Sequence, residues 1–340
     1  MRWRVAARVA VLAAVLAGFA RADDSLRVHF IDVGHGDCIF IQTPDGKTRD
    51  TPTERLRRTQ RGSVPVFPKQ GYRVLIDAGE VKYSRNWPVD YLKHLGLKRG
   101  DRIDYVIATH LDADHVDGLP IIYDTFHVLN TVEPGYAYGT TQAKAFRAAA
   151  CRESLEGTTY WRDPVKSGLI SKLGGKLRLG DELDARLLFY SANPGHGRDD
   201  TRTNFSSIVL RIRYGATSFL FMGDAPKVVE ESLLKLYPDT LLKSTVLKVG
   251  HHGSATASSK RFLKCVSPKY AVVCAGLRHG LPKAATLALL SDTCGAEVWR
   301  TDDHDKEEGK DSLTAAGDDN ILVTTNGKKD GLKVRWNRWN

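Results

Sequence analysis

Short apolar runs separated by turn residues fill the first third of the sequence. Runs of this length that are rich in Val, Ile, Leu and Phe are typical of β-strands when Gly, Pro, Asn or Asp bound them. The turn Thr43-Pro44-Asp45-Gly46 separates the second run from the third. Strands are therefore predicted at Leu26–Asp32, Asp37–Gln42, Tyr72–Asp77 and Ile103–Thr109.

The rest of the chain alternates apolar runs with segments of helical period. Helices are predicted at Pro88–Leu95, Pro226–Leu236 and around Ala284–Ser291. Strands are predicted at Ser207–Tyr214, Ser218–Met222, Val246–Val249, Tyr270–Cys274 and Glu297–Arg300, with a terminal hairpin of Ile321–Thr325 and Leu332–Trp336. Strands outnumber helices and hairpins are frequent, which favours a layered α/β protein with antiparallel or mixed sheets. The sequence has no glycine-rich dinucleotide fingerprint and no P-loop, which argues against a doubly wound nucleotide-binding fold.

The first 22 residues have the pattern of a secretory signal peptide. A basic start precedes the apolar stretch Val5 to Ala20, which only Arg8 interrupts, and Ala20-Arg21-Ala22 supplies small residues for cleavage. The alternative is a retained membrane anchor, but the stretch is short for a membrane of roughly 30 Å. We expect cleavage near Ala22, export to the periplasm or medium, and no stable membrane insertion afterwards.

The mature part, residues 23–340, is predicted to form one domain with insertions at about 47–71, 139–185 and 302–319. The first insertion is polar and carries arginines, for which we consider a solvated loop or contact with a polyanion: Arg49, Arg55, Arg57, Arg58 and Arg61. The second contains a predicted helix from Thr141 to Ala150. The third is acidic and loop-like.

Charge and cysteine content add modest information. The chain carries a formal net charge of +10, and loss of a leader with four arginines and no acid lowers it to +6. Such a balance favours an acidic partner such as nucleic acid, and also suits an ordinary soluble surface.

Cys38 and Cys274 lie in apolar runs, where buried thiols are expected. Cys151, Cys265 and Cys294 are the candidates for a disulfide.

The strongest chemical signal is His110-x-Asp112-x-Asp114-His115, directly after the predicted strand Ile103–Thr109. Four oxygen and imidazole donors within six residues can converge on one point with little chain entropy to lose. Such donors suit Zn²⁺, Mn²⁺ or Fe²⁺, and the lack of thiolates argues against a purely structural zinc site. The alternative, helix-capping acids beside an unrelated histidine, loses weight because similar donors recur downstream.

Those downstream donors are Asp224 and the pair His251-His252. Each follows an apolar β run, as the first cluster does. Asp224 has the alternative of capping the next helix, and one histidine of the pair has the alternative of a structural role. The three positions together predict a centre for one or two divalent metal ions, with Zn²⁺ first and Mn²⁺ or Fe²⁺ as alternatives.

The order of these motifs resembles the metallo-β-lactamase fold, and more narrowly the soluble hydrolase domain of ComEC-type DNA-uptake proteins and their stand-alone relatives. The resemblance implies a four-layer αβ/βα sandwich of the metallo-β-lactamase type. It runs from about Val28 to Ile321. The motifs that carry it are Asp32-Val33-Gly34-His35-Gly36-Asp37-Cys38, Leu75-Ile76-Asp77-Ala78-Gly79, Thr109 to Gly118, Asn204 to Leu210, Gly223-Asp224-Ala225 and Lys248-Val249-Gly250-His251-His252-Gly253-Ser254.

The resemblance also implies roles for the donor residues. His110 and Asp112 would hold one metal ion, and Asp114 and His115 the second. Asp224 would bridge the two ions, and His251 or His252 would complete the second site. Asp112 stands where the β-lactamase branch has a histidine. Asp114 would orient the metal-activated water, so Asp114, His115 and Asp224 are the predicted catalytic residues.

Other residues are expected beside the substrate or behind the ligands. Asn204 with Ser207 stands where many members have a histidine ligand, and His196 is the nearby alternative. His279 departs from the Gly-His-Pro pattern of ComEC-type sequences, which leaves its substrate role open. His35 is expected to lie in a tight turn, with contact to substrate as the alternative. Asp77 is expected to form a turn and to support a ligand from behind. Ser254 and Thr256 are expected either to cap the next helix or to contact phosphate oxygens.

The sequence thus predicts an exported metal-dependent hydrolase that uses a metal-activated water. The first hypothesis is a phosphodiesterase or nuclease that acts on DNA or RNA. The alternatives are a hydrolase of small esters, lactones or amides, with β-lactams disfavoured by Asp112, and a non-catalytic, metal-stabilised binding domain. No Ser-His-Asp arrangement stands out, and protein partners cannot be read from the sequence.

Overall fold

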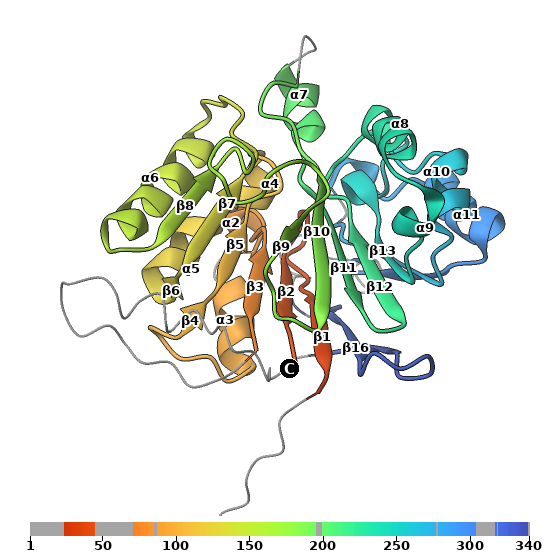
Figure 1. Cartoon of the computed structure of the whole chain (residues 1–340), viewed down its shortest axis with the longest axis horizontal. Coiled ribbons are helices and arrows are strands. Elements are labelled where there is room, and N and C mark those ends of the chain that lie inside the picture. The colour runs from red at the N-terminus through yellow and green to blue at the C-terminus, as the bar shows by residue number, and fades with distance from the viewer. Residues whose placement is uncertain are drawn as a thin grey trace, which may run out of the picture.

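Two β-sheets lie face to face in the centre of the molecule, and helices cover the outer face of each (Figure 1). This computed structural model describes residues 24–44, 71–84, 87–194, 199–276, 278–303, 317 and 319–338. The arrangement is helix, sheet, sheet, helix, so the predicted four-layer αβ/βα sandwich is confirmed.

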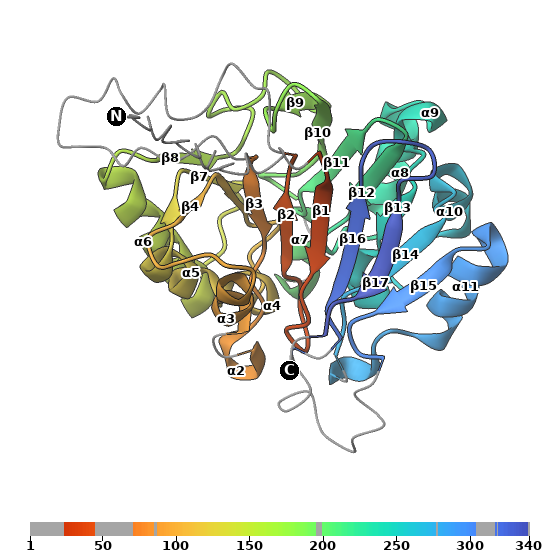
Figure 2. The ribbon, with the colours of Figure 1, turned by 90° about the horizontal axis from the view of Figure 1, so that it is seen from below.

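The first sheet has eight strands in the order β17-β16-β1-β2-β3-β5-β7-β8. Strands β17 to β3 pair antiparallel, whereas β3, β5, β7 and β8 pair parallel. Figure 2 shows β3, β2, β1 and β16 side by side from below. The bounds are β1 Leu26–Phe30, β2 Ile39–Gln42, β3 Arg73–Ile76, β5 Tyr105–Ile107, β7 Asn130–Glu133, β8 Thr159–Arg162, β16 Ile321–Thr325 and β17 Lys333–Trp336.

The second sheet has seven strands in the order β15-β14-β13-β12-β11-β10-β9. Strands β9 to β12 pair antiparallel, and β12 to β15 pair parallel. The bounds are β9 Gly175–Leu177, β10 Leu183–Phe189, β11 Val209–Tyr214, β12 Thr217–Phe221, β13 Val246–Lys248, β14 Tyr270–Val273 and β15 Glu297–Arg300. A separate parallel pair joins β4, Arg102–Ile103, to β6, His127–Val128.

Three apolar clusters fill the spaces between the layers, because successive strand residues point to opposite faces of a sheet. Val246 belongs to the cluster between the two sheets, and Leu247 to the cluster under the helices of the second sheet. Ile39 and Ile41 face the other sheet, while Phe40 between them faces the helices. Both faces of these strands are buried, so the strands are nearly continuous apolar runs.

The helices divide between the two outer faces. Figure 1 shows α3, α5 and α6 on one side and α8 to α11 on the other. The bounds are α2 Val81–Ser84, α3 Trp87–His94, α4 Ala113–Val116, α5 Leu119–Thr125, α6 Thr141–Leu155, α7 Asp199–Phe205, α8 Lys227–Leu236, α9 Asp239–Leu242, α10 Lys260–Val266 and α11 Ala284–Cys294. In the part of the chain that the structure describes, no helix has the length and apolar character to cross a membrane.

Most predicted elements are found within a few residues of their expected bounds, including the terminal hairpin of β16 and β17. The run Ile103–Thr109 is different, because it splits into β4 and β5. Asp104 between them is buried, pairs with Arg102 at 2.9 Å and accepts a hydrogen bond from the Arg73 backbone N–H at 2.8 Å. These contacts hold the chain at the change of direction.

The disulfide considered among Cys151, Cys265 and Cys294 is not formed, because all five cysteines are free. The Cys265 thiol contacts Asp239 at 3.3 Å, and the Cys294 thiol contacts the carbonyl of Leu290 at 3.0 Å, so the two thiols engage different partners. Cys38 and Cys274 are buried, as expected.

Several predictions lie wholly or largely outside the described residues. They are the signal peptide at 1–22, the insertion at 47–71 with its arginines, His196, and most of the insertion at 302–319. Within the segment 139–185 lie α6, β8 and β9. Strands β8 and β9 each form the last strand of a sheet, so this segment extends both layers.

Candidate metal centre

The predicted donor residues meet at one end of the sandwich, where neighbouring strands finish. His110 follows β5, Asp224 follows β12, and the pair His251-His252 follows β13. These strands belong to parallel pairs, so their carboxyl ends lie at the same edge of each sheet. Open α/β sheets place ligands at that edge.

His110, His115 and Asp224 form the first donor group. One possible ligand atom from each lies within 4.8 Å of the other two, and all three residues are buried. The imidazole rings of His110 and His115 are 4.1 Å apart between centroids. His115 Nε2 lies 3.5 Å from Asp224 Oδ1. This arrangement has the donor types and spacing of a site for one divalent ion.

His35, Asp114 and His252 form the second donor group, again within 4.8 Å. The Nε2 atoms of His35 and His252 each lie 3.3 Å from Asp114 Oδ2. His252 Nε2 also lies 3.2 Å from Asp224 Oδ2. Asp224 therefore directs one carboxylate oxygen to each group and stands between them.

Several donor atoms in these groups are buried without a hydrogen-bond partner among the described residues. They are Nε2 of His110, Nε2 of His115, Nε2 of His252 and Oδ1 of Asp224. Buried polar atoms in folded proteins nearly always have a partner. Divalent cations bound at the two groups would satisfy all four, so the residues present fit a metal centre.

Two hydrogen bonds direct the histidine rings toward this centre. Asp77 Oδ2 lies 2.8 Å from His115 Nδ1, and the carbonyl of Cys274 lies 2.8 Å from His252 Nδ1. A carbonyl oxygen can only accept, so His252 carries its proton on Nδ1, and the Asp77 carboxylate favours the same tautomer in His115. Both Nε2 lone pairs are then available to a metal ion, which is the usual arrangement behind metal-binding histidines.

Two carboxylates and two imidazole rings lie close together in this cluster and shift one another's pKa values: Asp114, Asp224, His115 and His252. Burial opposes protonation of His252, but Asp224 and Asp114 outweigh it and raise the pKa of His252 to about 10. Burial also opposes protonation of His115, but the nearby carboxylates of Asp224, Asp77 and Asp114 outweigh it and raise the pKa of His115 well above its usual value. Asp114 and Asp224 keep pKa values well below normal despite burial, because these histidines lie beside them. The carboxylates therefore stay ionised, and a bound cation would displace protons from the histidines.

The ligand pairs that the family resemblance implies are also close together. Asp112 Oδ2 lies 3.3 Å from His110 Nε2, and Asp114 Oδ2 lies 3.9 Å from His115 Nε2. The tightest groups place His110 with His115, and Asp114 with His252. Adjacent helical residues point about 100° apart. Asp114 and His115 both lie in α4, so they face different groups.

Asp112 and His251 lie at the margin of the centre and belong to neither of these groups of described residues. Asp112 Oδ2 lies 3.3 Å from His110 Nε2 and accepts a hydrogen bond from Thr203 Oγ1 at 2.8 Å. His251 contacts Thr256 Oγ1 at 2.7 Å through Nδ1, and its Nε2 is 3.9 Å from Asp224. Of the two adjacent histidines, His252 is the buried one beside Asp224.

The remaining predicted residues surround the two groups. Ser207 Oγ accepts a hydrogen bond from the Asp224 backbone N–H at 3.1 Å, so it supports that residue. Asn204 Nδ2 lies 3.4 Å from His251 Nε2. Ser254 Oγ accepts from Thr256 Oγ1 at 3.0 Å in an exposed turn. The exposed ring of His279 lies 5.4 Å from that of His35, on the solvent side of the second group.

Asp37 and Lys248 form a buried ion pair beside the centre that the sequence interpretation did not identify. Asp37 Oδ1 lies 3.5 Å from His252 Nδ1, and Lys248 Nζ lies 3.8 Å from Asp224 Oδ1. One signal was present in the sequence: Lys248 is the only charged residue in the apolar run Val246–Val249. A lysine is rarely buried without a partner.

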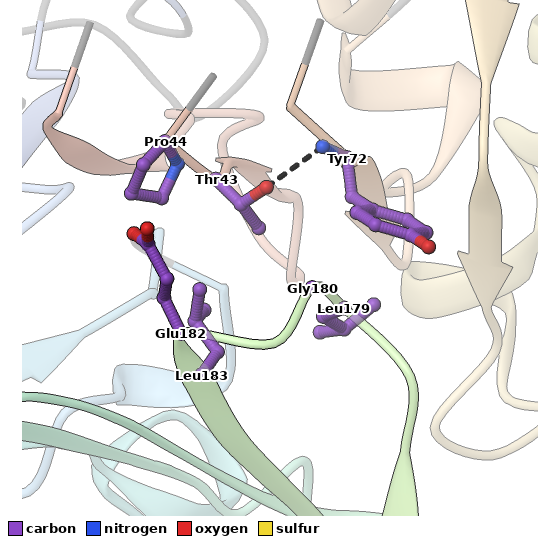
Figure 3. A pocket seen from close by; sticks show the side chains of 7 residues that line it. All are labelled: Thr43, Pro44, Tyr72, Leu179, Gly180, Glu182 and Leu183. Atoms are coloured by element: carbon purple, nitrogen blue, oxygen red, sulfur yellow. Dashed lines mark hydrogen bonds between the residues drawn. The ribbon is translucent and has the colours of Figure 1, made fainter. Parts of the chain in front are cut away.

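A small pocket lies where β2 ends and β10 begins (Figure 3), at the end of the sandwich away from the donor groups. It is lined by Thr43, Pro44, Tyr72 and the segment 179–183, with mainly apolar atoms. Thr43 Oγ1 accepts a hydrogen bond from the Tyr72 backbone N–H at 2.7 Å, on the side of the pocket opposite Leu179 and Leu183 (Figure 3). None of the metal-donor candidates lines this pocket, so the chemistry belongs to the other end.

Comparison with known proteins gives a consistent result. Residues 66–277 match the sequence model described as the Metallo-beta-lactamase superfamily. ComE operon protein 3 of Bacillus subtilis is 30% identical over 293 residues, which cover 81% of this chain and 32% of that protein. Competence protein ComA of Neisseria gonorrhoeae is 30% identical over 203 residues, which cover 60% of this chain and 24% of that protein. The chain spans about a quarter to a third of the length of these relatives.

Similarity to solved structures is weaker. The metallo-beta-lactamase fold protein YhfI from Bacillus subtilis is 11% identical, with a TM-score of 0.42 over 81% of this chain and 96% of that chain. At this level the similarity adds nothing to the match in sequence.

Proposed function

Since the chain belongs to the metallo-β-lactamase superfamily, we propose that it is an exported metal-dependent phosphodiesterase that cleaves DNA or RNA. Membership supports a metal-dependent hydrolase in general, and similarity to competence proteins supports a nucleic acid as substrate. The observation that carries the proposal is the pair of adjacent donor groups, with Asp224 between them, that contain buried, unpartnered nitrogen atoms.

The donor sets suggest which residues would hold which ion. His110, His115 and Asp224 would hold one divalent ion. His35, Asp114 and His252 would hold the other, with Asp224 beside His252. Zn²⁺ is our first choice because imidazole and carboxylate ligands dominate, with Mn²⁺ or Fe²⁺ as alternatives. When bound, such ions lower the pKa of a water molecule and polarise a phosphoryl oxygen.

The side chains themselves orient the reactants. Asp114 is more accessible to solvent than Asp224, with 19% of its side chain exposed compared with 4%. Its low pKa keeps it ionised at neutral pH, although burial acts against this. Asp114 Oδ2 would accept a hydrogen bond from the attacking water and hold it beside the scissile phosphate.

Polar groups on the rim are suited to the rest of a phosphodiester. Ser254 and Thr256 lie in an exposed turn beside His251. Lys227 crosses this turn, with Nζ donating to the Ala255 carbonyl at 2.7 Å, and places a positive charge at the entrance. Asn204 lies on the opposite side of His251. Hydroxyl, amide and ammonium donors of this kind bind phosphate oxygens in many proteins.

The test is cleavage of plasmid DNA, single-stranded DNA and RNA by the purified protein with Mn²⁺ or Zn²⁺. His115→Ala should abolish cleavage, while His94→Ala, an exposed change in α3, should leave it intact. Equal activity of His115→Ala and wild type would remove the proposed centre. If nucleic acids stay intact while metal binds, hydrolysis of small esters, lactones or amides, or a binding role, replaces the nuclease proposal.

Export is a separate part of the proposal, and it rests on the sequence of residues 1–22. Expression of the whole chain in a bacterium should yield periplasmic or secreted protein whose N-terminus lies near Asp23, as read by mass spectrometry. Recovery of full-length protein from the cytoplasm alone would refute it. We also propose that residues 23–340 form one domain, which predicts a single unfolding transition.

A further inference from the structure

Lys248 is a fully buried lysine inside the proposed metal centre that the hydrolytic chemistry does not use. It ends strand β13, directly before the turn that carries His251 and His252. Its Nζ pairs with Asp37 and donates a hydrogen bond to the Gly223 carbonyl at 3.0 Å. A cation this close to a metal centre opposes metal binding electrostatically, so its presence needs a reason.

Stability alone does not supply that reason. A buried ion pair contributes little compared with apolar residues of the same size, because both charges lose their hydration. Lys248 and Asp37 have 0% and 1% of their side chains exposed. A Met-Asn pair would fill similar space without the desolvation penalty.

The peptide group between Gly223 and Asp224 shows what Lys248 does. The carbonyl oxygen of this group accepts from Lys248 Nζ at 3.0 Å and from the His251 backbone N–H at 3.2 Å. Its N–H donates to Ser207 Oγ at 3.1 Å. Both polar atoms of one peptide plane are therefore fixed. Asp224 extends directly from that plane, and its carboxylate stands between the two donor groups.

Glycine is required at this position. Gly223 has φ of 52°, and a Cβ there would lie 3.0 Å from the Thr109 Cβ. Glycine tolerates this conformation but does not hold it. External hydrogen bonds must therefore set the orientation of the peptide plane.

We propose that Lys248 is a positioning residue that orients Asp224 for the two metal ions through the Gly223 carbonyl, with Asp37 as its charge partner. The inference rests on the proposed metal centre. It predicts that the role of Lys248 in metal binding is separable from its role in neutralising Asp37.

Two variants make that separation. Lys248→Met leaves Asp37 buried without its lysine partner and should lower both folding stability and metal affinity. The double variant Asp37→Asn/Lys248→Met removes both charges, so it should regain folding stability yet still bind Zn²⁺ about 10- to 100-fold more weakly than wild type, the usual cost of losing support behind a ligand. Lys264→Met, an exposed change in α10, is the matched control.

The measurements are urea unfolding in the presence of a chelator and Zn²⁺ affinity by competition with a chromophoric chelator. Ser207→Ala, which removes the hydrogen bond on the other side of the same peptide, should weaken Zn²⁺ binding to a similar degree. Wild-type affinity in either the double variant or Ser207→Ala would overturn the inference. Failure of wild type itself to bind Zn²⁺ or Mn²⁺ would instead remove the proposed metal centre.

Discussion

Asp77 is the residue whose replacement gives the sharpest test of how the centre is built. Its carboxylate accepts hydrogen bonds from the Thr109 backbone N–H at 2.8 Å and the Thr109 hydroxyl at 2.6 Å, and it faces His115 Nδ1 at 2.8 Å. Its backbone has φ of 56°, in the left-handed region where asparagine is among the best-tolerated residues. Asp77→Asn therefore changes the hydrogen bonding of His115 without straining the chain.

The magnitude follows from that one contact. Asparagine has a single acceptor oxygen, so the Thr109 donors and His115 compete for it. When the amide N–H₂ faces Nδ1, the ring takes its proton on Nε2 and cannot bind metal there. A hydrogen bond to a charged group contributes about 1.5–3 kcal/mol, which corresponds to roughly 10- to 150-fold in affinity. We expect Zn²⁺ affinity to fall within that range.

Competition with a chromophoric chelator at pH 7.5 measures the affinity, and thermal unfolding of the metal-free protein checks the fold. Asp124→Asn in α5 is the control, because the Asp124 side chain is 67% exposed and its carboxylate pairs with Arg152. If folded Asp77→Asn binds Zn²⁺ within about threefold of wild type, Asp77 does not set the His115 tautomer and the reasoning fails.

Three further predictions concern stability. Burial lowers the pKa of His29 to about 3, below the usual 6.5 of an unfolded chain, so the unfolded state binds the extra proton and stability falls as pH drops from about 6.5 toward 3. Between pH 7 and 5 the free energy of unfolding, measured with urea, should fall by about 2 kcal/mol because of His29. His29→Gln should remove this part of the pH dependence, and an unchanged pH dependence would contradict the prediction. Gly36→Ala should lower the free energy of unfolding by at least about 2 kcal/mol in the same assay. The reason is that Gly36 has φ of +128° and the new Cβ would lie 2.2 Å from the Asp114 carbonyl oxygen. Wild-type stability of this variant would show that the loop adjusts freely. Removal of metal with a chelator should lower the free energy of unfolding by about 2.7 kcal/mol, compared with protein in free Zn²⁺ at 100 times the dissociation constant. An unchanged midpoint in calorimetry would argue against a resident ion.

The layered architecture and most strand positions could be predicted from the sequence, because strands buried on both faces leave uninterrupted apolar runs. Tyr270–Cys274 is an example. The single strand predicted at Ile103–Thr109 was wrong, because the buried Asp104 divides this run into β4 and β5. Its partners, Arg102 and the Arg73 backbone, become visible only when β3 and β4 are placed together.

The candidate donors could be found from the sequence because each follows a strand directly. How closely the donors approach one another could not, since it depends on the direction in which α4 turns Asp114 and His115. Asp37 and Lys248 were missed for a different reason: their partnership joins β13 to the loop before β2, across most of the chain. Short-range spacing carries no information about such a contact.

The pairing of β1 with β16 has a consequence for the timing of folding. Leu26 lies opposite Thr325, so the first described strand finds this neighbour only after some 300 further residues have been synthesised. At about 5–20 residues per second, some 300 residues take about 15–60 s to emerge from a ribosome. The eight-stranded sheet therefore stays open during that interval. A translocation channel that accepts only unfolded polypeptide would have that whole interval in which to engage the chain.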